Sequence, residues 1–141
     1  MLKQKLSWLI AAGLGLAAGL LPPGVSAGQY DGSSNLICAA TDVVGCIDGP
    51  GCLQGHARAF ELPEFMAIDF QQKVVRATSE SGRKEVSPIK NMEQTGSQLI
   101  LQGIENGHGW SIAVDQNRGR MTTLVSGEDL GFIIFGACTA L

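Results

Sequence analysis

Four cysteines, Cys38, Cys46, Cys52 and Cys138, are the residues whose spacing says most about chemistry in this chain. Cys46 and Cys52 flank a turn-rich segment, residues 47–51, that can fold back and bring the two sulfur atoms together. Cys38 and Cys138 lie near the start and the end of residues 28–141. An even number of cysteines indicates disulfides if the compartment is oxidising. Of the three pairings that four cysteines allow, we therefore predict Cys46–Cys52 and Cys38–Cys138.

Metal binding is the alternative use of these cysteines. Cys46, Cys52 and His56 could supply three zinc ligands, with five and then three residues between them. These spacings lack the two-residue knuckle that is typical of structural zinc sites. The disulfide interpretation is therefore favoured, and no metal is predicted.

A second group with catalytic residue types is Ser111, His108 and Asp115. On one strand each residue rises about 3.4 Å, so Ser111 and Asp115 would lie roughly 13 Å apart. His108 would point to the opposite face from Ser111, because successive side chains alternate. A nucleophile and its base must share a hydrogen bond, so the sequence predicts no catalytic site here, and we expect a protein that is not an enzyme.

The first 27 residues predict export. Two lysines precede an apolar run, residues 6–21, which two prolines end. Val25, Ser26 and Ala27 then place small residues at a cleavage site, so we expect the mature chain to begin at Gly28. The apolar run is shorter than the roughly 20 residues of a membrane span. The sequence thus predicts a periplasmic or secreted protein with no membrane span after cleavage, which places the cysteines in an oxidising compartment.

Length and charge limit the classes of protein that remain. The chain has 141 residues and a net charge of −3, which indicates one domain and gives no electrostatic reason to expect nucleic-acid binding. A Rossmann or barrel-enzyme cofactor fold does not fit in this length, and no cofactor is predicted. Residues 28–35 are rich in Gly and Ser and are expected to form a flexible leader. Residues 36–141 are expected to form a single β domain.

The elements that must position these residues are short strands. Alternating apolar residues and close turn signals predict about eight of them. They are residues 36–44, 65–70, 74–79, 85–92, 98–104, 108–115, 120–125 and 131–138. Residues 45–55 are expected to form a loop, residues 55–61 a helical turn, and Pro88 an edge or bulge. Sequential hairpins predict an all-β, antiparallel up-and-down barrel or a related sandwich, with Cys38–Cys138 joining the first strand to the last.

The interior of such a barrel can hold a ligand or be filled by side chains. Medium-sized apolar residues recur at alternate strand positions and favour a filled core. They are Met66, Ile68, Phe70, Leu99, Leu101, Ile112, Val114 and Ile134.

Several stretches resemble an uncharacterised family of small exported proteobacterial proteins with paired cysteines and LQGxENGxxWS and FGAC motifs. The matching residues run from Cys38 to Cys138, and the most specific stretch is Leu99 to Ser111, LILQGIENGHGWS. The GFIIFGAC sequence of residues 131–138 supplies the second motif. The resemblance implies a small secreted β domain with paired cysteines, and no established activity, substrate or catalytic residue.

Within that stretch, Glu105, Asn106, His108 and Trp110 are the candidate binding residues. A place in the core is the simpler interpretation of Trp110, because Ile112 shares its face. The leading functional hypothesis is a non-catalytic binding or interaction protein of the cell envelope, whose partner would be another envelope protein. A barrel that carries a small ligand is the alternative, and an enzyme ranks third.

Overall fold

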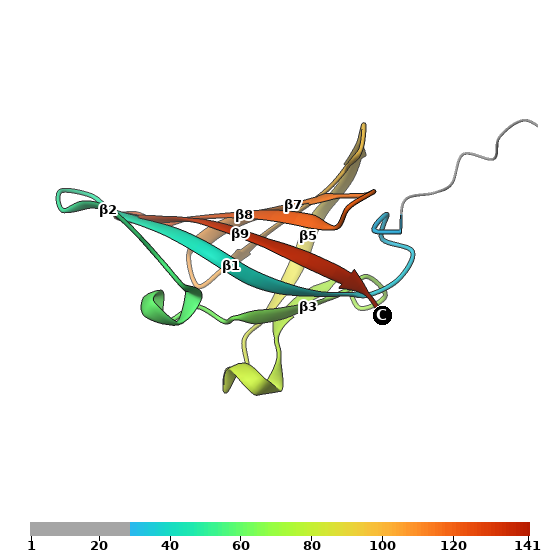
Figure 1. Cartoon of the computed structure of the whole chain (residues 1–141), viewed down its shortest axis with the longest axis horizontal. Helices are drawn as coiled ribbons and strands as arrows, with labels where there is room; N and C mark the ends of the chain where they lie inside the picture. The colour runs from blue at the N-terminus through green and yellow to red at the C-terminus, as the bar shows by residue number, and fades with distance from the viewer. Residues whose placement is uncertain (1–28) are drawn as a thin grey trace, which may run out of the picture.

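A computed structural model describes residues 29–141, which form an antiparallel sheet of nine strands with two short 3₁₀ turns (Figure 1). The strands are β1 (Leu36–Ile47), β2 (Gly51–Gly55), β3 (Phe65–Asp69), β4 (Val74–Ala77), β5 (Val86–Thr95), β6 (Gln98–Glu105), β7 (His108–Asp115), β8 (Arg120–Ser126) and β9 (Leu130–Ala140). The 3₁₀ turns are η1 (Ala57–Phe60) and η2 (Ser79–Ser81). The predicted all-β class is confirmed.

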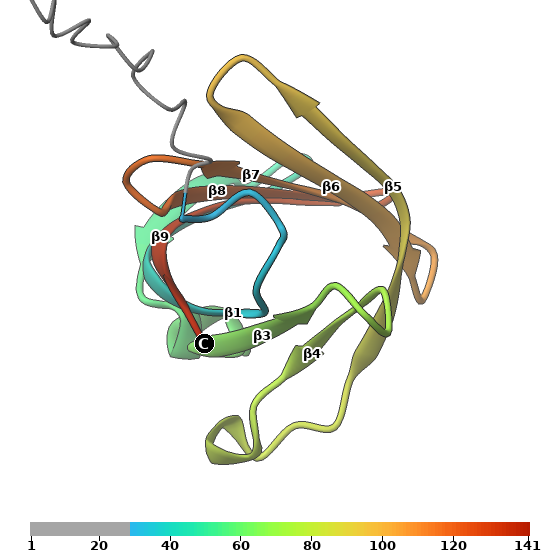
Figure 2. The same cartoon turned by 90° about the vertical axis from the view of Figure 1, so that its right-hand side faces the viewer.

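Eight of these strands close into a barrel, as the view along its axis shows (Figure 2). Hydrogen-bonded neighbours run in the order β1-β3-β4-β5-β6-β7-β8-β9, and β9 pairs with β1 along its length. Each strand from β3 to β9 therefore lies beside its sequence neighbour, which is the predicted up-and-down order. The pairing of β9 with β1 joins the last strand to the first, which removes the two edges that an open meander would expose.

β2 is a ninth strand, and the prediction of a loop for residues 45–55 is wrong there. It pairs only with the end of β1, in a hairpin that extends past the barrel (Figure 1). Four glycines and a proline in residues 45–55 favoured a loop, but the turn is confined to residues 48–50, and Gly51 already pairs with Ile47. The positive φ angles of Gly49 and Gly51 allow this tight reversal. The predicted helical turn at residues 55–61 is present as η1.

Both predicted disulfides are confirmed. Cys38 pairs directly with Cys138 across the β1–β9 seam, and Cys46 pairs with Cys52 across the β1–β2 hairpin. The first bond is buried in the barrel core, whereas Cys52 is exposed. Because Cys46 and Cys52 are bonded to each other, neither is available as a zinc ligand.

A β-bulge on β1 explains why the two disulfides face different ways. Thr41 is the extra residue, because Ala40 pairs with Gly136 and Asp42 pairs with Phe135. Its hydroxyl donates a 3.1 Å hydrogen bond to the Phe135 carbonyl. An inserted residue reverses the alternation of side chains. Cys38 before the bulge therefore faces the core, and Cys46 after it faces out. A second bulge, next to Pro88 as predicted, lies between Ile89 and Asn91 on β5.

One half of the barrel interior is filled. Its side chains are inward-facing and buried, and they come from strands all around the barrel: Leu36, Cys38, Ile68, Leu99, Leu101, Val114, Met121 and Cys138. Tyr30 and Phe70 are partly buried and pack against this cluster. The expectation of a filled core therefore holds for this half only.

The segment predicted as a leader is described from Gln29 onward and contacts this filled end. The Tyr30 amide donates to the Gln116 carbonyl, and Asn35 Oδ1 accepts a 3.0 Å hydrogen bond from the Phe70 amide. The predicted signal peptide, residues 1–27, and the start of the mature chain at Gly28 lie outside the described residues. Within residues 29–141, no helix has the length and apolar character needed to cross a membrane.

Candidate functional site: a pocket in one end of the barrel

The other half of the interior is only partly filled. Val43, Ala57 and Ile134 form a small buried cluster there, against which Phe60 and Leu62 pack. A pocket of about 390 Å³ opens at the end where the β6–β7 and β8–β9 turns lie. Its lining comes from β3 through β9 and from the segment after η1, so it is surrounded by the barrel wall. Pockets that bind small molecules have volumes from about 300 Å³ upward and are mostly apolar with a few polar groups. This pocket is therefore large enough for a small ligand.

The strand register arranges the pocket in two layers. Ile112, Thr123 and Ile134 are paired in register on β7, β8 and β9 and form its floor. Trp110, Val125 and Phe132 form the next layer toward the opening. One layer further in, Val114 and Met121 are buried and do not line the pocket, because the filled half begins there.

Trp110 is fixed on the wall of this pocket by two neighbours. Its indole Nε1–H donates a 2.7 Å hydrogen bond to the hydroxyl of Ser87, which is buried on β5. Its ring lies against Gly103, the residue paired with it on β6. A Cβ atom at Gly103 would be 2.2 Å from Trp110 Cζ2, closer than any contact that can persist. Gly103 thus leaves the space that the indole occupies.

We therefore expect Gly103→Ala to displace the indole and break its bond to Ser87. Trp110 is the only tryptophan after residue 27, so the intrinsic fluorescence of the processed chain reports on it alone. The emission should shift to longer wavelength, and stability should fall by about 1–3 kcal/mol because the interior is overpacked. Gly109→Ala is the matched control, since its new Cβ would meet only Ser126 Oγ, at 3.5 Å. Unchanged emission from the Gly103 variant would contradict this placement of the indole.

Thr123 is an unusual residue for the pocket floor. Its side chain faces inward and is 4% exposed, and its Oγ1 has no hydrogen-bond partner among the described residues. A buried hydroxyl without a partner costs about 1–3 kcal/mol. Valine has nearly the same shape and would avoid this cost. Stability therefore does not explain why a threonine stands at this position.

The opening of the pocket carries charged and polar side chains. Arg83 and Glu85 form an ion pair of 3.1 Å, and Arg76 lies 3.7 Å from Asp69. Arg76, Arg83 and Glu85 line the pocket, and so does Glu105 at the end of β6. Both arginines at the opening therefore already face a carboxylate.

All four candidate binding residues from the sequence line this one pocket. Asn106 and Gly107 have φ angles of 50° and 81°, so the predicted Asn-Gly hairpin turn is present between Glu105 and His108. The His108 ring lies against Gly127 in the β8–β9 turn, where a Cβ would be 2.5 Å away. Its Nδ1 is 3.1 Å from the Asn106 carbonyl oxygen. Trp110 both packs against the core and lines the pocket.

Sequence reasoning missed the two hydroxyls inside the pocket, Ser87 and Thr123. Thr123 lies between Thr122 and Leu124, whose side chains face outward, so Thr123 faces inward. The alternation in this strand could therefore have indicated a polar residue on the apolar face. Ser87 had no such signal, because Pro88 beside it obscured the pattern of β5.

The structure does not bring Ser111, His108 and Asp115 together. Ser111 faces the outer surface of β7, whereas His108 lines the end pocket. Asp115 accepts hydrogen bonds from the Arg118 guanidinium and from the backbone amides of Arg118 and Asn117. These bonds, with the Arg118 side chain first, hold the pKa of the Asp115 carboxyl below its usual range. Asp115 therefore stabilises the β7–β8 turn.

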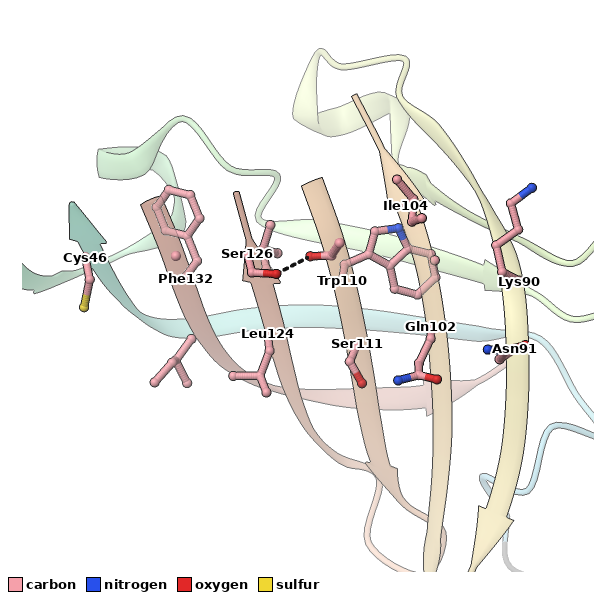
Figure 3. A pocket seen from close by; sticks show the side chains of 15 residues that line it. Cys46, Lys90, Asn91, Gln102, Ile104, Trp110, Ser111, Leu124, Ser126 and Phe132 are labelled. Atoms are coloured by element: carbon pink, nitrogen blue, oxygen red, sulfur yellow. Dashed lines mark hydrogen bonds between the residues drawn. The ribbon is translucent and has the colours of Figure 1, made fainter. Parts of the chain in front are cut away.

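A second hollow lies on the outer face of the sheet (Figure 3). Gln102, Ser111, Leu124 and Phe132 are among the residues labelled along it, and Ser126 Oγ donates to the Gly109 carbonyl at its edge. We call this hollow the outer groove. Its volume of about 720 Å³ exceeds that of the end pocket, but its walls come mainly from one face of the sheet. Ile104, Leu124 and Ile133 expose apolar surface there.

Comparisons of the chain with protein-family models, with curated proteins and with solved structures find no match. Among the described residues no group of three or more His, Cys, Asp or Glu side chains is placed to hold a metal ion.

Proposed function

We propose that this protein is a non-catalytic binding protein of the cell envelope, and that it binds a small molecule in the end pocket. The observation that carries the proposal is the division of the barrel interior. A large buried cluster fills one half, while the other half holds a smaller cluster and leaves about 390 Å³ open at the end of the barrel. An unfilled apolar interior costs stability, so a cavity of this size is typical of barrels that hold a ligand.

The lining of the pocket supports binding more than catalysis. Apolar side chains form most of its inner wall, and its two buried hydroxyls belong to Ser87 and Thr123. Ser87 is hydrogen-bonded to the Trp110 indole, which cannot act as a base. Neither hydroxyl is paired with a histidine or a carboxylate among the described residues, as an activated nucleophile would be.

The disulfides support the proposed compartment. Two disulfide bonds are consistent with an extracytoplasmic location. The predicted signal peptide supports the narrower proposal of a periplasmic or secreted protein. In that location the protein would hold an apolar molecule away from water.

Binding of a neutral fluorescent probe, N-phenyl-1-naphthylamine, tests the proposal. The exported protein should enhance the emission of the probe in a saturable way, and Val125→Phe should abolish the enhancement. Val125 is partly buried and lines the pocket between Trp110 and Phe132, so the added ring should take up volume that the pocket leaves open.

Leu124→Ser is the matched control, because Leu124 is the next residue on β8 and faces the outer groove, half exposed. It should leave probe binding unchanged. Loss of binding in the Leu124 variant and not in the Val125 variant would place the probe on the outer groove and overturn the proposal. Absence of saturable binding to the wild-type protein would also overturn it.

Interaction with another envelope protein is the second candidate, and the outer groove is the observation that favours it. Ile104, Leu124 and Ile133 are 62%, 50% and 37% exposed, and such exposed apolar surface can mark an interface. Under this candidate, a partner that copurifies with the wild-type protein should be lost with Leu124→Ser and retained with Val125→Phe. The reverse result would assign the partner to the barrel end.

A further inference from the structure

We infer that the ligand of the end pocket is an uncharged, largely apolar molecule with an acceptor oxygen, such as a ketone, ester or amide carbonyl, which lies against Thr123. The inference rests on the proposed function and names the chemical class that the same pocket selects. Three features of the pocket carry it: the free hydrogens of its two hydroxyls, the absence of a buried charge among the described residues, and the apolar residues of its wall.

The hydroxyls define the hydrogen bonding that the pocket offers. Ser87 Oγ accepts the hydrogen bond from Trp110, so the hydrogen of Ser87 is left to donate. Thr123 on the floor has no partner for its hydroxyl among the described residues. Two buried groups that each retain a hydrogen to donate are satisfied best by an acceptor atom on the ligand. A carbonyl oxygen has two lone pairs and no hydrogen of its own, so it fits this requirement.

The charges argue against an ionised ligand. The two arginines that line the pocket lie at its opening, where Arg83 is paired with Glu85 and Arg76 with Asp69. No charged side chain among the described residues is buried in the barrel interior. A buried charge needs a partner of opposite sign, so a carboxylate or an ammonium group would have none beside Thr123.

The other residues that line the pocket favour a ligand that is largely apolar. Ile112, Ile134 and Met66 are buried around the floor, and Val125 and Phe132 continue the wall toward the opening. A ligand that replaces water against these side chains gains the hydrophobic contribution along its length. A ligand whose oxygen atom reaches the pocket floor can then accept a hydrogen bond from the Thr123 hydroxyl, whereas a hydrocarbon of the same shape cannot.

A pair of compounds that differ only in that oxygen tests the inference. 2-Acetylnaphthalene and 2-ethylnaphthalene share one ring system, and each can compete with N-phenyl-1-naphthylamine for the wild-type protein. One neutral hydrogen bond contributes about 1 kcal/mol, so the ketone should displace the probe at a roughly five- to tenfold lower concentration.

Thr123→Val should remove most of this preference and leave displacement by 2-ethylnaphthalene unchanged or improved. It should not lower the melting temperature, because it removes a hydroxyl that has no partner. Thr123→Ser, which restores a hydroxyl at the same position, should recover part of the preference for the ketone.

Different results would contradict the proposed function and the proposed ligand class. If the probe binds and responds to Val125→Phe, but the two naphthalenes displace it equally well, the proposed function stands and the ligand class is wrong. The ligand class is also wrong if Thr123→Val keeps the full preference for the ketone. If the probe does not bind the wild-type protein, the proposed function itself is wrong.

Discussion

Replacing both Cys38 and Cys138 by Ala should lower the melting temperature on the order of 15 °C or more. The bond closes a loop with a sequence separation of 100, and the chain-entropy model gives about 4–5 kcal/mol for a loop of that length. Its sulfur atoms are also buried in the core beside Met66 and Met121, so their removal leaves a cavity. Thermal unfolding followed by circular dichroism measures the change.

The matched control is replacement of both Cys46 and Cys52 by Ala. That bond has a sequence separation of 6 and joins a hairpin outside the closed barrel, so the same model gives about 2 kcal/mol. Peptide mapping without reduction should show that each double variant retains its other disulfide. Equal shifts in the two variants would reject loop length and core burial as the reasons for the difference.

Gly136→Ala should have the second largest effect, a loss of about 3 kcal/mol and a drop in melting temperature on the order of 10 °C. Gly136 lies on β9 opposite Ala40, beside the bulge on β1. A Cβ there would be 2.2 Å from the Ala39 carbonyl oxygen and 2.8 Å from Met121 Cε. The Met121 side chain could move, but the Ala39 oxygen belongs to the backbone of the strand that closes the barrel.

Gly131→Ala on the same strand is the control for this substitution. The nearest atom to its new Cβ would be the Val125 carbonyl oxygen, at an ordinary 3.5 Å. Its stability should therefore change by less than about 0.5 kcal/mol. A comparable loss of stability in both glycine variants would show that the close approach at Gly136 is not the cause.

The sequence alone was sufficient for the order of the eight barrel strands and for the disulfide pairing, but it did not indicate β2. Alternation of apolar residues is a local property, and a turn such as Asn106-Gly107 needs only the φ angles of its own residues. In an up-and-down barrel most neighbours in sequence are neighbours in space, so local signals determine most of the topology. The same logic joined Cys38 to Cys138, because a meander that closes must bring its ends together.

Tertiary structure decided which way the side chains face beyond the bulge. Cys38 and Cys46 are eight residues apart, so regular alternation would place them on one face of β1. The extra residue Thr41 reverses the pattern, next to the close approach of β9 at Gly136. A bulge depends on the partner strand, and no local pattern in β1 indicates it.

The pocket was also decided only by the closed barrel. Ile112 and Ile134 are apolar and face inward, as do the residues of the filled half, and nothing in their types separates a wall from a packed core. Whether opposite walls touch depends on the distance across the barrel and on the size of every side chain in that layer. The alternation of apolar residues therefore indicated that Trp110 points inward, while only the closed barrel determined that Trp110 and Thr123 line a pocket.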